Sequence, residues 1–458
     1  MNQHHSPAPV IPDSIGLLNS VFCKHWFHQP AVAIWSDAAT VRAWIDVEIA
    51  LAQAQSELGL IPAEAGQTIA SHLAAAPIDL RRLAVDIAHT MHPFVPLLRQ
   101  LEELCGEPAA AYLHWGATTQ NIVDTGTALQ LKQSHTLLMA FIDKALSALA
   151  RLAREHRDTP QAGRTHGQHA LPITFGFKVA AWHGEMRRHR ERLTLAAREA
   201  FVASMGGAVG TFSAMASQGR EVQKLLAEQL ELQPNELPMR STFDRQAAYI
   251  SVIALMGSTV EKIAGEIFTL QRTEIAELEE GFHRGQIGSS TMAQKRNPGL
   301  AMNLSGLSRL LRARIPLLLE GMVRHDEGDG TANNVCDVTL PEAMCCAVSL
   351  ADGLATLIGG VQVDADAMAR NLARSDGTIV SEAVMMALAS HIGRHHAHQV
   401  LYDVAQDTAE AGGVFAQRLR NHPLVRPLVG QVDIDALLDP TSYLGEAALC
   451  VDSELSRL

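Results

Sequence analysis

Long stripes of apolar residues at helical spacing constrain the fold of this chain most strongly. In one stretch an apolar residue recurs every seven positions, and two more fill the same face (Leu131, Leu138, Ala145 and Leu152; Ile142 and Leu149). A stripe of this length corresponds to about 45 Å of helix, which is typical of a helical bundle. A second stripe alternates steps of four and three along Tyr249, Ile253, Met256, Val260, Ile263, Ile267 and Leu270, and a third follows Pro298 through Leu304, Leu307 and Leu311. Stripes this long exceed what one small domain can cover, so we expect helices to pack between subunits too.

The sequence therefore predicts an all-α fold with three helical domains. Residues 1–116 form an N-terminal helical domain, of which residues 1–14 are a disordered tail. Residues 117–365 form a central bundle of long helices, interrupted by a loop at 281–298. Residues 366–458 form a small C-terminal domain of shorter helices.

Two helix boundaries are also predicted. One helix extends from Ala31 to a stop signal at Gly59 and Pro62, and the first long helix of the bundle starts at Asp124 and Thr125. The sequence shows no strand-like alternation of any length and no internal repeat.

Composition narrows the class of protein. The 458 residues carry a formal charge of −12, which argues against a nucleic-acid partner because phosphate binding needs a basic surface. The six cysteines show no C-x-x-C pair, so we expect reduced thiols in a cytoplasmic protein. There is no signal-peptide pattern, and we expect no apolar run of membrane-spanning length and no contact with a membrane.

A glycine-rich stretch from Gly281 to Pro298 is the strongest candidate for a functional site. Its core reads Gly-Ser-Ser-Thr-Met-Ala-Gln-Lys-Arg-Asn-Pro, and its proline suits the first turn of a helix. Hydroxyls, a lysine and an asparagine next to the free N–H groups of a helix N-terminus could hold carboxylates of an acidic substrate. The Ser289 hydroxyl could act as a base if Lys295 and oriented N–H groups stabilise its alkoxide. The alternative is a solvated linker between helices, which is what such clusters usually are.

Three other polar clusters interrupt the helical pattern. Residues 118–121 (Thr-Thr-Gln-Asn) read either as a helix cap or as a carboxylate cradle. Residues 163–172 place His166, a candidate proton donor, between two glycines that leave room for a ligand. Residues 89–93 (His-Thr-Met-His-Pro) form a turn. A histidine-rich run at 391–398 could bind a metal through His391 with His395 or through His395 with His398. A polar helix surface is the better interpretation of this run. We therefore expect no metal and no cofactor.

The glycine-rich stretch resembles the signature loop of the fumarase/aspartase superfamily, Gly-Ser-Ser-x-Met-Pro-x-Lys-x-Asn-Pro, with Ala293 in place of the proline. Residues 114–125 and the tail at 438–445 resemble the 3-carboxy-cis,cis-muconate cycloisomerase branch. Residues 164–170 and 33–62 instead resemble adenylosuccinate lyase. The chain is thus similar to both branches and intermediate between them.

The resemblance implies a role for each matching residue. Ser289 would be the general base that takes the Cβ proton of a succinyl group, and His166 the general acid, with His92 as a second candidate near the leaving group. The residues that would bind the substrate, and so stabilise an aci-carboxylate intermediate, are His92, Thr118, Thr119, Gln120, Thr165, Ser290, Met292, Lys295 and Asn297. The loop would have to close over the substrate first.

Departures from the family patterns restrict which substrates the chain can be expected to accept. Met302 stands where the lyases usually have a glutamate that orients the histidine, whereas the cycloisomerases usually have tryptophan at His166. Trp26 and Phe27 replace an Arg-Tyr pair of adenylosuccinate lyase, and Asp337 falls near the position of its phosphate-binding arginine. Because an aspartate repels a phosphate, we predict that adenylosuccinate is not the substrate.

The resemblance favours a cofactor-independent lyase that removes a nitrogen- or oxygen-linked group from a small substituted succinate and releases fumarate. One alternative is a 3-carboxy-cis,cis-muconate cycloisomerase, favoured by Met302 and the tail. Another is an inactive structural homologue, which the joint presence of Ser289, His166, Lys295 and Asn297 opposes. The resemblance also implies a small di- or tricarboxylate substrate and a homotetramer whose active sites are shared between subunits.

Overall fold

The computed structural model describes residues 18–457, and its secondary structure is predominantly helical, so the all-α prediction is confirmed. Residues 1–17, which contain the predicted tail, lie outside the described residues. By contacts the chain divides into two units, each built from three separate segments. Unit 1 comprises residues 1–142, 189–258 and 306–352, and unit 2 comprises residues 143–188, 259–305 and 353–458. The three-domain division stays a prediction.

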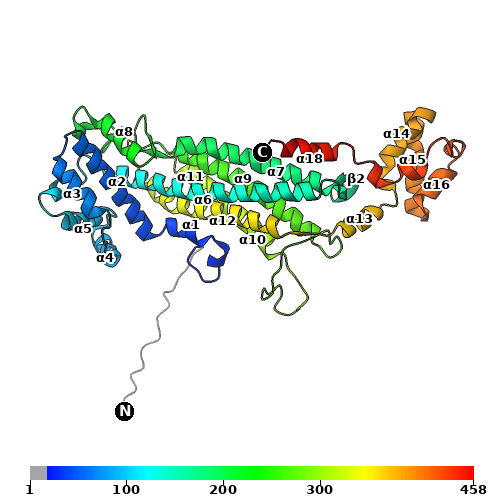
Figure 1. Ribbon diagram of the computed structural model, residues 1–458, viewed down its shortest axis with the longest axis horizontal. Helices are drawn as coiled ribbons and strands as arrows, with labels where there is room; N and C mark the ends of the chain where they lie inside the picture. Colours follow the sequence, from blue (N-terminus) through cyan, green and yellow to red (C-terminus); the bar gives the residue numbers. More distant parts are fainter. Residues whose placement is uncertain (1–17, 458) are drawn as a thin grey trace, which may run out of the picture. The chain divides into compact units, whose positions relative to one another are not determined.

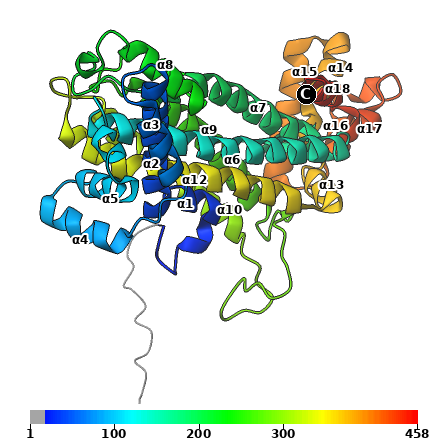
Figure 2. The ribbon, with the colours of Figure 1, turned by 60° about the vertical axis from the view of Figure 1, so that its left-hand side comes forward.

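Unit 1 contains a group of helices that share one apolar core with the start of the first long helix (Figures 1 and 2). Its helices are α1 (Gln29–Ile34), α2 (Asp37–Glu57), α3 (Ala63–Leu73), α4 (Leu80–Thr90), α5 (Val95–Cys105), α8 (Gly219–Gln229) and α11 (Ile315–Glu320). Two short parallel strands, β3 (Val202–Ala203) and β4 (Gln233–Pro234), also belong to it. The core is rich in leucine, isoleucine and alanine, as expected where α2, α3 and α5 pack together.

Unit 2 contains an antiparallel hairpin and the shorter C-terminal helices. The hairpin strands are β1 (Pro160–Thr165) and β2 (Gln168–Thr174), and β5 (Leu278–Glu279) pairs with β6 (Gln362–Val363). The helices are α13 (Ala365–Ala373), α14 (Ser381–Ile392), α15 (Arg394–Ala411), α16 (Phe415–Asn421), α17 (Ile434–Leu437) and α18 (Ala447–Leu455). Helices α14, α15 and α16 form a compact group with their own core (Figure 1). The predicted change to shorter helices is confirmed.

Five long helices contribute residues to both units: α6 (Thr119–Glu155), α7 (Phe175–Ala200), α9 (Asp244–Leu270), α10 (Gly299–Arg312) and α12 (Gly330–Gly360). The three predicted stripes lie on α6, α9 and α10, and all their residues are buried. Helix α12 had no predicted stripe because apolar residues surround almost its whole circumference between Ala343 and Ala351.

Two of these helices correct the expectation about membrane-spanning runs. Helices α9 and α12 are long and apolar enough to cross a membrane, with mean hydropathies of 1.3 and 1.6 in their most apolar windows. The windows are 61% and 72% buried by the rest of the protein. Core helices of a bundle meet the same criteria of length and composition, so the test is weak evidence for a membrane span.

Two predicted helix boundaries were wrong. The helix expected to begin at Ala31 is broken at Trp35, and α2 starts after Ser36, whose side chain accepts a hydrogen bond from Ala39 N (3.3 Å). Helix α6 starts at Thr119 rather than Asp124. Its polar first turn fits because Asn121 Oδ1 accepts hydrogen bonds from the backbone of Thr118 (3.1 Å) and of Gly207 (3.0 Å), a contact that the local sequence does not reveal.

The hairpin corrects the expectation that the chain has no strands. Its strands pair Thr165 with Gln168, so only His166 and Gly167 form the turn. Both have positive φ, 53° and 78°, as a type I′ turn requires. The two strands contain one glycine and two prolines, and their polar and apolar residues do not alternate, so they lack the pattern by which strands are recognised.

Candidate active site

The predicted signature loop is a loop in the structure. It joins β5 to α10 and runs outside the helices (Figure 1). Ser290, Met292 and Lys295 are exposed, whereas Ser289 and Asn297 are half-buried. Gly288 is required by close packing, because a Cβ atom at this position would lie 2.2 Å from the Lys295 carbonyl oxygen.

Hydrogen bonds within the loop hold Ser289 in a defined environment. The Ser289 Oγ atom accepts hydrogen bonds from the backbone N–H groups of Met292 (3.1 Å) and Thr291 (3.3 Å). The Asn297 side chain donates to the Gly288 carbonyl (2.7 Å) and closes the loop next to the serine. Two N–H dipoles therefore point at the Ser289 oxygen, where they would stabilise negative charge on it.

The N-terminus of α10 does not offer the free N–H groups that the sequence suggested. The Glu280 carboxylate accepts hydrogen bonds from the N–H groups of Leu300 (2.8 Å) and Ala301 (2.9 Å). Glu280 is buried, and its own N–H donates to the Gln271 side chain. The expected carboxylate site at this helix end is thus filled by a carboxylate of the chain itself.

Arg296 connects the second half of the loop to β5 and to the start of the loop. Its guanidinium forms an ion pair with Glu279 (2.8 Å) and lies over the Phe282 ring, 5.1 Å from the centroid. Its carbonyl accepts a hydrogen bond from the Gln271 side chain (3.3 Å). A cavity of about 700 Å³ adjoins these residues and is also lined by Ala293.

The hairpin turn presents the predicted acid. Thr165 and His166 are exposed at its tip, and His166 makes no hydrogen bond within the described residues. Behind the tip, Arg164 pairs with the fully buried Glu277 (2.5 Å). The hairpin is therefore anchored one residue before the predicted site.

Glu277 is a residue that the sequence analysis missed. Its carboxylate also accepts hydrogen bonds from the side chains of Gln161 (2.7 Å) and Asn371 (2.8 Å). These partners lie about a hundred residues away along the chain on either side. No local pattern marks such a cluster, because Glu277 is one of several glutamates in the stretch Glu274–Glu280 and the sequence does not distinguish it from the others.

The turn that contains His92 is a helix cap. His92 Nδ1 accepts hydrogen bonds from the N–H groups of Val95 (3.0 Å) and Phe94 (3.2 Å) at the start of α5. An accepting ring nitrogen carries no proton, so the proton of the neutral ring is on Nε2. Nε2 is therefore the ring nitrogen left to form a hydrogen bond with a substrate.

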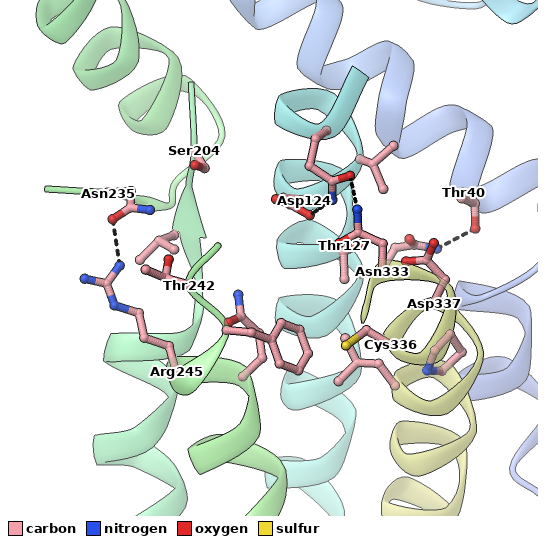
Figure 3. A pocket seen from close by; sticks show the side chains of 18 of the residues that line it. Thr40, Asp124, Thr127, Ser204, Asn235, Thr242, Arg245, Asn333, Cys336 and Asp337 are labelled. Carbon is pink, nitrogen blue, oxygen red and sulfur yellow. Dashed lines mark hydrogen bonds between the residues drawn. The ribbon is translucent and has the colours of Figure 1, made fainter. Parts of the chain in front are cut away.

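The first turn of α6 leads into a cavity of about 330 Å³ in unit 1 (Figure 3). Thr118 and Thr119 are half-buried at the start of the helix. Gln120 lines the cavity, donates a hydrogen bond to the Asp124 carboxylate and accepts one from the Asn333 side chain (2.7 Å). Of the predicted binding residues in this cluster, Gln120 is thus the one that faces the cavity.

The cavity is lined by charged residues of both signs, a feature that the sequence did not reveal. Figure 3 shows Asn235 and Arg245 on one side and Asp124, Asn333 and Asp337 on the other. Burial raises the pKa of Asp124 to about 6. Burial also raises the pKa of Asp337, and the neighbouring Arg324 guanidinium opposes that shift. Both effects follow from removing a carboxylate from water.

The predicted site residues fall into two groups. His92, Thr118, Thr119 and Gln120 belong to unit 1, whereas Thr165, His166, Ser289, Ser290, Met292, Lys295 and Asn297 belong to unit 2. Within unit 2 the structure assembles the loop around Ser289, and within unit 1 it assembles the cavity around Gln120.

The histidine-rich run differs from the predicted single helix. Gly393 separates α14 from α15, so His391 lies on one helix and His395 and His398 on the next. All three side chains are exposed. Among residues 18–457 no group of three or more His, Cys, Asp or Glu side chains is arranged to hold a metal ion.

Known proteins resemble the chain over nearly its whole length. The sequence profile of a family described as "Lyase" matches residues 28–310, and that of "Adenylosuccinate lyase C-terminus" matches residues 377–453. The N-acetyl-S-(2-succino)cysteine lyase of Enterococcus italicus is 37% identical over 93% of each chain. Among solved structures, a fumarate lyase from Mesorhizobium sp. BNC1 has a TM-score of 0.89 and 34% identity, covering 94% of this chain and 98% of its own. The 3-carboxy-cis,cis-muconate lactonizing enzyme from Pseudomonas putida has a TM-score of 0.89 and 33% identity, covering 96% and 98%.

Proposed function

The chain belongs to the lyase family of the fumarase/aspartase superfamily, and from this premise we propose that it eliminates a heteroatom-linked group from a substituted succinate and releases fumarate. The sequence suggested nitrogen or oxygen as the linking atom. The name of the relative from E. italicus adds sulfur. In each case the carbon–heteroatom bond breaks, a Cβ proton leaves the succinyl group and the leaving group takes up a proton.

The observation that carries this proposal is the environment of Ser289. Removal of a Cβ proton needs a strong base, and a serine hydroxyl becomes one only as its alkoxide. The N–H groups of Thr291 and Met292 already point at Oγ, and Lys295 supplies positive charge on the same loop. These groups favour the alkoxide in the way that an oxyanion hole favours an oxyanion.

The remaining residues of the proposed site would stabilise the negative charge of the intermediate and protonate the leaving group. Proton loss from Cβ leaves a doubly charged aci-carboxylate, which Lys295, Asn297 and the hydroxyls of Thr118, Thr119, Thr165 and Ser290 would stabilise. His166 would protonate the leaving atom from the exposed hairpin tip, because imidazole exchanges protons near neutral pH. Met292 and His92 would border the substrate.

The test is fumarate release, followed by ultraviolet absorbance, from succinates substituted through sulfur, nitrogen or oxygen. We expect release from at least one of them and a loss of about 10³-fold in kcat for Ser289→Ala. Ser290→Ala is the matched control, because it removes the neighbouring hydroxyl, which accepts no backbone N–H group; its loss should be about tenfold or less. Equal losses in the two variants would contradict the role of Ser289.

A cycloisomerase is the second candidate, favoured by Met302. This residue is 47% exposed and offers no carboxylate to orient a histidine. Consumption of carboxymuconate without fumarate release from any succinate would establish this alternative. Adenylosuccinate belongs in the same panel, and its efficient turnover would contradict our expectation from Asp337, which lines the cavity next to a second acid, Asp124.

A further inference from the structure

The cavity of unit 1 carries one uncommitted cation. Arg245, at the start of α9, donates one hydrogen bond to the Asn235 side chain (3.0 Å) and makes no other within the described residues. Its remaining guanidinium donors are available to a ligand, since Arg245 lines the cavity and is half-buried. A guanidinium with free N–H groups suits a carboxylate.

The other arginine of the cavity is committed to the protein. Arg324 donates to the carbonyls of Gly321 (2.8 Å) and Arg240 (3.1 Å) and to the Asn333 side chain (2.8 Å). Its guanidinium also lies over the Phe243 ring, 5.0 Å from the centroid. Arg324 therefore holds the wall together, and Arg245 is the arginine left for a ligand.

Four aspartates line the cavity (Asp37, Asp124, Asp244 and Asp337), and Figure 3 shows Asp124 and Asp337 on the side away from Arg245. Asp124 accepts a hydrogen bond from Gln120, but it forms no ion pair within the described residues. Asp337 forms neither a hydrogen bond nor an ion pair there. Asp124 is half-buried and Asp337 is exposed, and the Arg324 charge acts on both without forming an ion pair with either. An ammonium group of a ligand between the two carboxylates would give them a direct cation partner.

We propose that this cavity binds the leaving group of the reaction and that the leaving group is an α-amino acid with a free ammonium group. Its carboxylate would bind Arg245 and Asn235, and its ammonium would lie between Asp124 and Asp337. The proposal rests on the proposed function, because it identifies the heteroatom-bearing part of the substituted succinate. An N-acylated amino acid keeps the carboxylate but lacks the cation, and a phosphate would meet two acids.

Gln120 links the cavity to the proposed reaction. It is one of the residues expected to hold a substrate carboxylate, and its side chain bridges Asp124 and Asn333. A succinyl carboxylate near the first turn of α6 would therefore place the linked amino acid beside the two aspartates. The cavity volume of about 330 Å³ is sufficient for a side group of amino-acid size.

The test measures binding without turnover, by calorimetry on the full-length Ser289→Ala variant at about pH 8, above the pKa of Asp124. The two ligands are S-methyl-L-cysteine and N-acetyl-S-methyl-L-cysteine, which differ in the ammonium group. We expect the unacylated ligand to bind at least about tenfold more tightly. Adding Asp337→Asn or Asp124→Asn should reduce this ratio to about twofold or less.

Two further variants complete the design. Asp326→Asn removes a negative charge from the loop before α12, outside the cavity, so the ratio of the two affinities should not change. Asparagine tolerates the φ of 52° at this position. Arg245→Gln should weaken both ligands to a similar extent, because both have the carboxylate. Equal binding of the two ligands to the parent protein, or a ratio that survives both aspartate substitutions, would overturn the proposal.

The reaction itself is followed separately in the unsubstituted enzyme. Fumarate release without preference between S-(2-succino)cysteine and its N-acetyl derivative would refute the inference and leave the elimination intact. Binding discrimination by the aspartates together with no fumarate from any succinate would refute the elimination, and with it the role of the amino acid as leaving group, while the amino-acid site itself would remain.

Discussion

At the scale of single residues, the proposed chemistry of the loop depends on Ser289. The sequence showed a serine near a lysine, an arrangement also common in solvated linkers. The structure adds the N–H groups of Thr291 and Met292 at the serine oxygen and the Asn297 side chain that closes the loop. This geometry favours a charged oxygen, which a solvated linker has no need to stabilise.

The pH dependence of stability can test whether the Asp124 carboxylate is removed from water in the folded protein. Its pKa is raised from 3.8 to about 6 on folding, so between these values the folded protein binds more protons at this site than the unfolded chain. Its contribution to stability is fully present below about pH 4 and is lost as the pH rises through about 6. At pH 8 the ionised group should cost up to about 3 kcal/mol.

We therefore predict that Asp124→Asn stabilises the protein at pH 8 by about 1–3 kcal/mol and has little effect at pH 4. Asparagine can still accept the hydrogen bond from Gln120, so the substitution removes mainly the charge. Urea unfolding at the two pH values measures the difference. A stability difference that is the same at both values would show that Asp124 is not buried as described.

At the scale of elements, Glu280 connects the signature loop to α10. Its carboxylate satisfies two N–H groups that would otherwise be unpaired at the start of the helix. The loop residues Lys295 and Asn297 lie directly before this helix. The cap thus stabilises the end of the loop as well as the helix.

We predict that Glu280→Ala lowers the free energy of unfolding by about 1–2 kcal/mol, as loss of a helix cap does. Glu279→Ala is the matched control, since it removes the adjacent carboxylate and breaks only an exposed ion pair with Arg296, worth about 0–1 kcal/mol. Denaturant titration measures both variants. If Glu279→Ala is the more damaging of the two, the capping role is wrong.

At the scale of the whole molecule, apolar side chains remain exposed on the long helices of the single chain. Leu255 on α9 and Val338 on α12 are exposed by 55% and 64%, and Phe268 and Met302 are exposed by 37% and 47%. Exposed apolar residues on core helices are typical of surfaces that pack against another chain. They support the expectation that these helices pack against other subunits, which the resemblance gave as a homotetramer.

We predict that two inactive variants complement each other. If Ser289 and His166 of one site come from different subunits, mixed oligomers of Ser289→Ala and His166→Asn should regain about a quarter of the wild-type activity. In an equal mixture, the subunit that supplies the serine has Ser289 with a probability of one half, and the subunit that supplies the histidine has His166 with the same probability. Asparagine suits the positive φ at position 166, so the hairpin should persist. Activity is measured after co-refolding, with mixed oligomers verified by native mass spectrometry. Mixed oligomers without activity would contradict shared sites.

Much of the fold follows from local patterns. The apolar stripes predicted the long helices because a helix that buries one face repeats its apolar residues every three or four positions. Glycine and proline marked the loop at 281–298, since both residues act on their own backbone. The hairpin was not predicted because its strands contain glycine and proline and do not alternate, and α12 was not predicted because it is apolar on nearly all sides.

The sequence by itself determined the helical class, the signature loop and the residue types available for carboxylate binding, because each depends on neighbours within a few positions. Only the tertiary structure decided that Glu280 fills the end of α10 and that Glu277 anchors the hairpin. The tertiary structure alone also places Asp124 and Asp337 across one cavity from Arg245. These side chains are far apart along the chain, and electrostatic complementarity between distant residues leaves no periodic trace in a sequence.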